Sequence, residues 1–252
     1  MNRREFSKSL TTSIASYALF RSLFLKDAFA DAIKPVTDSW LRDLHDMSMD
    51  LRQGQITPTQ WQSKVNELFD RVELEYLLRG IDFEKLAHGF EYPDLGVHTK
   101  SVRFPALAGL PVNLAFFSKI FGMKKDRAII PHGHRNMVSC HCVIKGDFRL
   151  RHYDKLEDSD THMIILPTVD EVVRIGSHSA ISDERNNIHW LKAMTETAFT
   201  YDVIVVDLGG EKYEIENIDP YSSEKLANGQ LRVAKLSVED ALQKYGHDTH
   251  HV

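Results

Sequence analysis

The chain has 252 residues, of which 42% are hydrophobic, with thirteen glycines and eight prolines. This apolar content is enough to bury one good core, and the composition excludes fibrous and disordered classes. The formal net charge is −5, although the first thirty residues are basic, with five Lys or Arg and two acidic residues. The remainder therefore carries about −8, which argues against nucleic acid as a partner.

The two cysteines, Cys140 and Cys142, are separated by one residue. Residues at this spacing on a strand rarely have disulfide geometry, so the sequence predicts no disulfide framework. Both thiols are expected to be small buried side chains rather than a redox pair.

The start of the chain has the pattern of an export signal. Arg3-Arg4 with Phe6 and Lys8 resembles the twin-arginine motif, an apolar run covers 10–25, and Ala28-Phe29-Ala30 has the small-x-small cleavage pattern. The run is too short and too polar for a membrane span. We therefore expect a twin-arginine signal peptide at 1–30, cleaved near Ala30. The twin-arginine machinery would export the folded protein to the periplasm, with no stable membrane insertion after cleavage. An uncleaved amphipathic helix is the alternative.

Residues 31–90 are predicted to form a helical N-terminal extension. In its first helix, apolar residues recur at spacings of three and four and make one stripe: Trp40, Leu41, Leu44, Met47 and Leu51. Gln53-Gly54 ends that helix, and Thr57 and Pro58 are the N-cap and first residue of the next. A third helical segment covers roughly 74–88.

Beyond Tyr92, short β-rich runs alternate with turn residues at regular intervals, which is typical of an all-β sandwich or barrel. The runs are 101–104, 113–117, 127–130, 139–144, 148–153, 163–166, 172–175, 190–194 and 201–208. Residues 91–235 are therefore predicted to form the barrel. Residues 236–252 are expected to be a short helix followed by a flexible His-rich tail.

A proline-led His-x-His, Pro131-His132-Gly133-His134, is the candidate site of chemistry. Side chains at i and i+2 of a strand point to one face, so His132 and His134 would lie side by side. Two imidazoles fixed on a stiff scaffold are half of a metal site. His189 is the third candidate ligand, since a closed barrel can bring distant strands together.

The spacing around these histidines resembles the cupin signature. That signature has an acidic ligand five residues after the second His and a glycine seven residues further, and here these positions are Ser139 and Gly146. The expected fold is mainly β: a cupin (double-stranded β-helix) barrel with an N-terminal helical extension. With serine at the acidic position, three neutral imidazoles would leave a divalent iron its full charge and three open positions.

Two blocks also resemble the 2-aminoethanethiol dioxygenase and plant cysteine oxidase family over about 95–210. The first runs from Pro131 to Met137 and on to Gly146 and Tyr153-Asp154; the second holds Asn187-Ile188-His189, Ala193 and Asp202-Val203-Ile204. The resemblance implies a mononuclear non-haem Fe(2+) enzyme that adds both atoms of dioxygen to a thiol, giving a sulfinic acid. It further implies that His132, His134 and His189 bind the iron and that Asp202 acts near the substrate.

The chain also departs from this family. The Pro-Pro-Tyr that usually follows the Asp-Val/Ile strand is absent, because residues 205–210 read Val-Val-Asp-Leu-Gly-Gly, and the family's C-terminal Gly-Arg-Asp segment has no counterpart. These differences leave the thiol open among cysteine, cysteamine, mercaptopropionate and a cysteine-ended peptide.

Two further residues are candidates for a catalytic role. In the cupin register, Ser139 and His141 face the interior, so His141 is placed either to hydrogen-bond substrate or to be a satisfied core histidine. The phenol of Tyr153 either reaches the pocket or packs in the core.

Two other functions remain open. One is a different cupin enzyme, such as a decarboxylase or isomerase that uses Mn, Ni or Zn; it would need a Glu at 139 or a fourth ligand, unless His141 serves. The other is a non-catalytic periplasmic binding or sensor module that uses its metal to hold a ligand.

Overall fold

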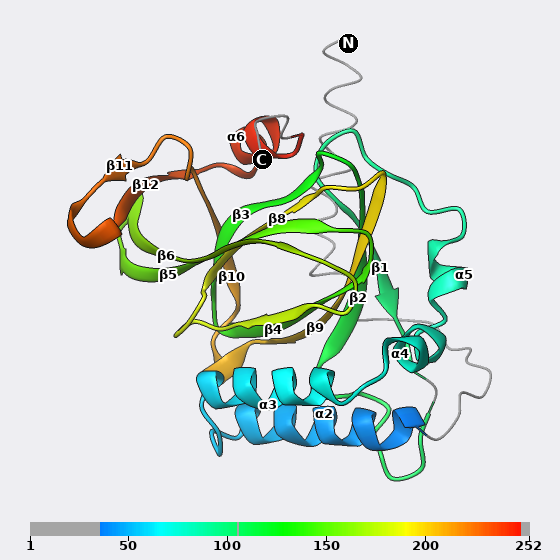
Figure 1. Cartoon of the computed structure of the whole chain (residues 1–252). Helices are drawn as coiled ribbons and strands as arrows, with labels where there is room; N and C mark the ends of the chain where they lie inside the picture. Colours follow the sequence, from blue (N-terminus) through cyan, green and yellow to red (C-terminus); the bar gives the residue numbers. More distant parts are fainter. Residues whose placement is uncertain (1–35, 105, 248–252) are drawn as a thin grey trace.

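The structure is a computed structural model that describes residues 36–104 and 106–247 (Figure 1). The expected signal peptide at 1–30 and the last five residues of the tail lie outside the described residues. No helix in the described part of the chain is long and apolar enough to cross a membrane.

Two sheets make up most of the molecule. The first has the order β1-β2-β9-β4-β7 and the second the order β10-β3-β8-β5-β6-β12-β11. The strands of the first sheet are β1 (His98–Val102), β2 (Phe117–Lys124), β4 (Met137–Lys145), β7 (His178–Ile181) and β9 (Thr197–Val206). Those of the second are β3 (Ala128–Arg135), β5 (Phe148–Asp158), β6 (His162–Val173), β8 (Ile188–Ala193), β10 (Glu214–Ile218), β11 (Glu224–Lys225) and β12 (Leu231–Leu236).

The eight strands β2 to β9 follow the order of a jelly roll: β5 and β6 are consecutive in the second sheet, and every other step crosses between the sheets. Strands β2, β9, β4 and β7 are neighbours in one sheet, β3, β8, β5 and β6 in the other, and each paired neighbour is antiparallel. This arrangement of two Greek keys is the double-stranded β-helix of cupins. The predicted fold, a mainly β cupin barrel with an N-terminal helical extension, is confirmed.

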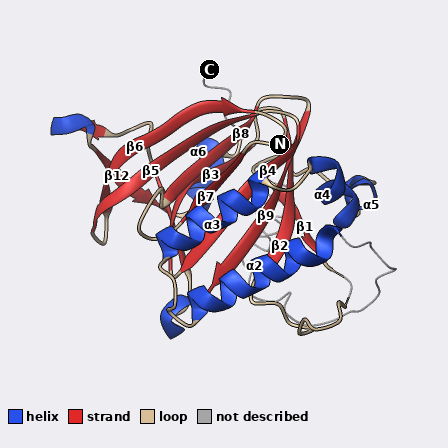
Figure 2. Ribbon diagram, turned by 60° about the horizontal axis from the view of Figure 1, so that its bottom comes forward, coloured by secondary structure: helices blue, strands red, loops and turns tan. Residues whose placement is uncertain are grey.

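Helices α2 (Val36–Arg52) and α3 (Pro58–Asp70) lie across the outer face of the first sheet (Figures 1 and 2). All five predicted apolar residues of α2 are buried. Thr57 caps α3 as predicted, with Gln60 completing a capping box. The helices and the outward-facing side chains of β2, β4 and β9, such as Cys140 and Tyr201, form one hydrophobic core.

Several local expectations differ from the structure. The third predicted helix is two short ones, α4 (Leu74–Gly80) and α5 (Phe83–Ala87), because Asp82 between them has a left-handed backbone that ends the first. The runs at 163–166 and 172–175 are one long strand, β6. Strands β7 and β10 to β12 were not predicted, whereas the short C-terminal helix, α6 (Val238–Tyr245), was.

Candidate metal centre

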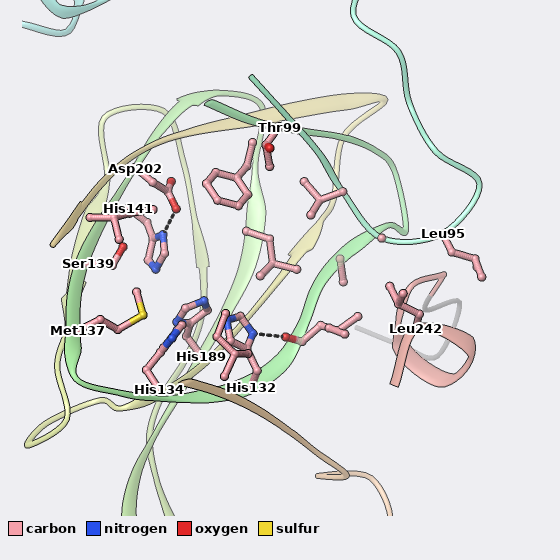
Figure 3. Close-up of a pocket in the computed structure, with 18 residues that line it drawn as sticks. Leu95, Thr99, His132, His134, Met137, Ser139, His141, His189, Asp202 and Leu242 are labelled. Atoms are coloured by element: carbon pink, nitrogen blue, oxygen red, sulfur yellow. Dashed lines mark hydrogen bonds and ion pairs between the residues drawn. The ribbon is translucent and has the colours of Figure 1, made fainter. Parts of the chain in front are cut away.

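His132, His134 and His189 come together inside the barrel, on the inner face of the second sheet. His132 on β3 is the direct cross-strand partner of His189 on β8, and His134 lies two residues further along β3. Each ring offers one nitrogen, and these three atoms lie within 4.8 Å of one another. Figure 3 shows the three rings facing a common point. The ring centroids are 4.3 to 4.9 Å apart.

The backbone around the His-x-His is fixed by two neighbours. Asn187, which is buried, accepts from the His134 N–H at 3.2 Å and donates to the His134 carbonyl at 2.8 Å. A Cβ on Gly133 would lie 2.9 Å from Asn187 Oδ1 and 3.0 Å from Ile188 Cγ1, so only glycine fits between the two ligands. The segment Asn187-Ile188-His189 thus holds the backbone of Gly133 and His134 in place and supplies the third histidine.

The ring of His132 is also oriented by the backbone. Its Nδ1 is 2.7 Å from the Ile130 carbonyl, to which it donates, so the lone pair of Nε2 faces the other two rings (Figure 3). A metal-binding imidazole commonly has this partner on its other nitrogen.

The residues fit a divalent metal ion. Burial lowers the pKa of His132 to about 4 and takes the pKa of His134 and His189 well below the usual value, so the rings are neutral and can bind a metal. Both ring nitrogens of His134 and Nδ1 of His189 are buried and have no hydrogen-bond partner among the described residues. Orphaned buried nitrogens are costly unless something binds them, and a metal ion is the partner that neutral imidazoles prefer.

His141 and Asp202 form a pair on the opposite wall, from the first sheet. They are cross-strand partners on β4 and β9, and His141 Nδ1 is 2.5 Å from Asp202 Oδ2. Both side chains are buried. The His141 ring is centred 4.6 Å from that of His189, and its Nε2 has no partner among the described residues. The pair is therefore beside the candidate metal site and separate from the ligand group.

Two interior residues were missed at the sequence level. His152 on β5 is the other cross-strand neighbour of His189, is fully buried and has a pKa lowered to about 3, chiefly by burial. Lys119 on β2 is paired with Asp202 and is 4% exposed; burial lowers its pKa to about 8, against the opposing effect of Asp202. The alternation of side chains along a strand would have placed both residues in the interior, had the register of β5 and the extent of β2 been known.

Tyr153 is not part of this group. It is paired with Ile188, so it faces away from His189, and it packs in a small apolar cluster with Ile218 and Val233. Of the two placements that the sequence left open, packing is the one observed. Arg149 and Arg151 also lie outside, where both contact Asp170 and Arg151 stacks on Trp190.

A cavity of about 50 Å³ connects the three-histidine group with the His141–Asp202 pair. This volume has room for a few water molecules. Three sets of side chains line the cavity. The first is the three candidate ligands His132, His134 and His189, the second is His141, Ser139 and Asp202, and the third is apolar side chains that include Met137 and Ile204. Four of its lining residues are half-buried: Leu95, Val97, Thr99 and Ile215.

No family model matches the chain, and no curated protein matches its sequence. Among solved structures it is similar to KdgF from Halomonas sp., at 14% identity and a TM-score of 0.32, covering 47% of this chain and 87% of that chain. A protein with a double-stranded β-helix domain from Klebsiella pneumoniae matches at 11% identity and a TM-score of 0.35, covering 50% and 84%. Procruciferin, an 11S globulin from Brassica napus, matches at 11% identity and a TM-score of 0.35, covering 50% of this chain and 28% of the globulin. The chain thus spans less than a third of the globulin's length, and at these TM-scores the fold assignment rests on the strand order. The strand order and the buried histidines describe a cupin barrel with a three-histidine group that can hold a metal ion.

Proposed function

We propose that this protein is an iron(II)-dependent thiol dioxygenase that converts a small thiol to its sulfinic acid. The observation that carries the proposal is the composition of the ligand group, which has three neutral imidazoles and no carboxylate. Among the 18 described residues that line the cavity, the one carboxylate is Asp202, and it is bonded to His141. A divalent iron held this way would keep its full charge and open positions for a thiolate and dioxygen.

The His141–Asp202 pair supplies a base beside the proposed metal. Asp202 accepts from His141 Nδ1–H, which fixes the tautomer in which Nε2 carries a lone pair. That nitrogen has no other described partner and lies next to His189, where a metal-bound thiol would be. In this proposal His141 takes the thiol proton, and Asp202 stabilises the imidazolium that forms.

The overall reaction balances without another reactant. The thiol sulfur gains two oxygen atoms and loses four electrons, and dioxygen accepts those four electrons. The proton that His141 removes leaves with the sulfinic acid or to solvent. No reductase or organic cofactor is needed, which suits an enzyme working outside the cytoplasm.

The first test is metal analysis of protein purified without added metal, followed by dioxygen uptake with small thiols. We expect iron near one per chain, thiol-dependent uptake and a sulfinate product. Manganese, nickel or zinc would favour another cupin reaction, and iron without uptake would favour a binding or sensor role.

Variants separate the metal site from the base. His132→Ala, His134→Ala and His189→Ala should each abolish stoichiometric metal binding, and full occupancy in any of them would remove that residue from the site. Asp202→Asn should keep the metal and lower the turnover number by about 10²- to 10⁴-fold, the range for general-base catalysis. His178→Ala, whose ring packs on Phe69 outside the barrel interior, is the matched histidine control.

We also propose that the protein is exported by the twin-arginine route and works in the periplasm. The support is the sequence pattern from Arg3 to Ala30. Replacing Arg3 and Arg4 with lysine should leave unprocessed precursor in the cytoplasm. Normal processing of that variant would contradict this route. The proposed partners are the thiol, dioxygen and the export machinery, with neither nucleic acid nor stable membrane insertion after cleavage.

A further inference from the structure

The cavity extends past the metal ligands to a place where no described strand completes the wall. Strand β10 pairs with β3 from His132 to Arg135 and leaves residues 128–131 of that edge without this neighbour. The cavity is lined there by Ala128, Ile129 and Ile130, together with Leu242 of α6 and residues 95–97. Helix α6 and this segment therefore take the place of a strand (Figures 1 and 3).

The two parts of this wall touch directly. The Gly96 N–H donates to the Gly246 carbonyl at 2.8 Å. A Cβ on Gly96 would lie 3.0 Å from Leu242 Cδ2, and Gly96 has φ of +73°, so glycine permits both the turn and the close approach. Leu242 is 3% exposed. Helix α6 and residues 95–97 therefore meet at this end of the cavity.

Helix α6 is held firmly in that position. Its buried face packs on Ala128, Ile130 and Trp190. The Tyr245 hydroxyl donates to Asp219 at 2.5 Å, and Lys244 Nζ contacts the other oxygen of the same carboxylate at 2.6 Å. These anchors make Leu242 a fixed part of the cavity wall.

This end of the cavity is aliphatic. Figure 3 shows Leu95 and Leu242 together at the end away from Asp202. None of the 18 described lining residues is Lys or Arg. A charged group placed at this end would lose its hydration without gaining a partner, whereas a carbon chain would lose nothing.

We propose that Leu242, with Leu95 beside it, is a specificity-determining residue that receives the carbon chain of the metal's ligand and limits its length. The inference rests on the proposed metal site and deepens it, because it names the substrate class as short thiols with an uncharged carbon chain. The family resemblance does not extend to this segment, since α6 lies beyond the residues that it covers.

A series of n-alkyl hydroxamates, from acetohydroxamate to hexanohydroxamate, tests the length limit on the Co(2+)-loaded protein. Hydroxamates bind a metal with open positions whatever reaction it catalyses, and the cobalt absorption spectrum reports binding. Wild type should bind the short members better. In Leu242→Ala, the affinity of the longest probe relative to the shortest should rise about tenfold or more, because each further buried methylene favours binding roughly fourfold.

Val238→Ala is the matched control, because Val238 is on the same helix and packs on the same cluster but does not line the cavity. It should keep the wild-type ratio. Leu95→Ala opens the same wall from outside the helix and should act like Leu242→Ala even if the latter fails to fold. An unchanged ratio in a folded variant would overturn the inference. Failure of metal-loaded wild type to bind any hydroxamate would overturn it together with the metal site, whereas inactivity toward thiols would overturn the proposed reaction alone.

Discussion

His152 provides a direct test of how dry the barrel interior is. The side chain is fully buried, its Nε2 has no described partner, and burial lowers its pKa from 6.5 to about 3. Its Nδ1 is 3.5 Å from the Ser179 hydroxyl, at the limit of a hydrogen bond. His152→Gln removes the titrating group and keeps a polar side chain of similar length. We expect the metal-free variant to resist acid better than metal-free wild type.

The magnitude follows from the two pKa values. The unfolded chain binds the proton near pH 6.5, and the folded protein binds it only near pH 3. Between these values the unfolded state carries more protons, so the free energy of unfolding rises with pH and falls on acidification. From pH 7 to pH 4 this one group should cost wild type about 3 kcal/mol, at about 1.4 kcal/mol per pH unit below 6.5.

Urea unfolding of both metal-free proteins at pH 7 and pH 4 measures this difference. Wild type should lose about 3 kcal/mol more than His152→Gln between the two pH values. His132, with a pKa near 4, titrates in both proteins and cancels in the comparison. His178→Gln, outside the barrel interior, should lose as much as wild type. Equal losses in wild type and His152→Gln would refute the desolvation argument.

Three further predictions address the neighbours of the site. Gly133→Ala forces a Cβ against Asn187 and Ile188, so it should lower stability by about 1–3 kcal/mol and weaken metal binding, as thermal unfolding and metal titration would show. Asn187→Ala removes both hydrogen bonds to His134 and should weaken metal affinity about 10- to 100-fold; an unchanged affinity would mean that packing alone positions the ligand. In wild type the free energy of unfolding should rise by about 3 kcal/mol from pH 8 to pH 10.5, because in that range the unfolded chain still binds the Lys119 proton that the folded protein has lost. Lys119→Met should abolish this rise. Denaturant unfolding of wild type and variant side by side would measure it, and a rise of equal size in both would contradict the assignment.

The parts of the site that the sequence predicted are those that strand parity fixes locally. The His-x-His places both rings on one face of β3, and the cupin register places Ser139 and His141 in the cavity with Cys140 and Cys142 in the helix-covered core. A period of two needs no knowledge of the partner strand. The fold followed from the regular turns and the cupin spacing.

The parts that the sequence missed depend on long-range register. On β5 nothing local says which of His152 and Tyr153 points inward, and the pairing of His152 with His189 settles it. Strand β2 was placed too early, at 113–117, because Ser118, Lys119 and Lys124 look like surface residues; Lys119 is buried beside Asp202. The place of α6 over the cavity depends on contacts between residues far apart in sequence, such as Gly96 and Gly246, which no local pattern encodes.

The two walls of the barrel have different mechanical support. All three candidate ligands belong to the second sheet, whereas His141 and Asp202 belong to the first, whose outer face rests on α2 and α3. The distance between His141, the proposed base, and the proposed metal is therefore set by how the two sheets stack, and helices α2 and α3 support the sheet that carries His141. If the proposed function holds, loosening that helical layer, for example with Trp61→Ala, would let His141 shift while the proposed metal stays bound, so turnover would fall before metal content did.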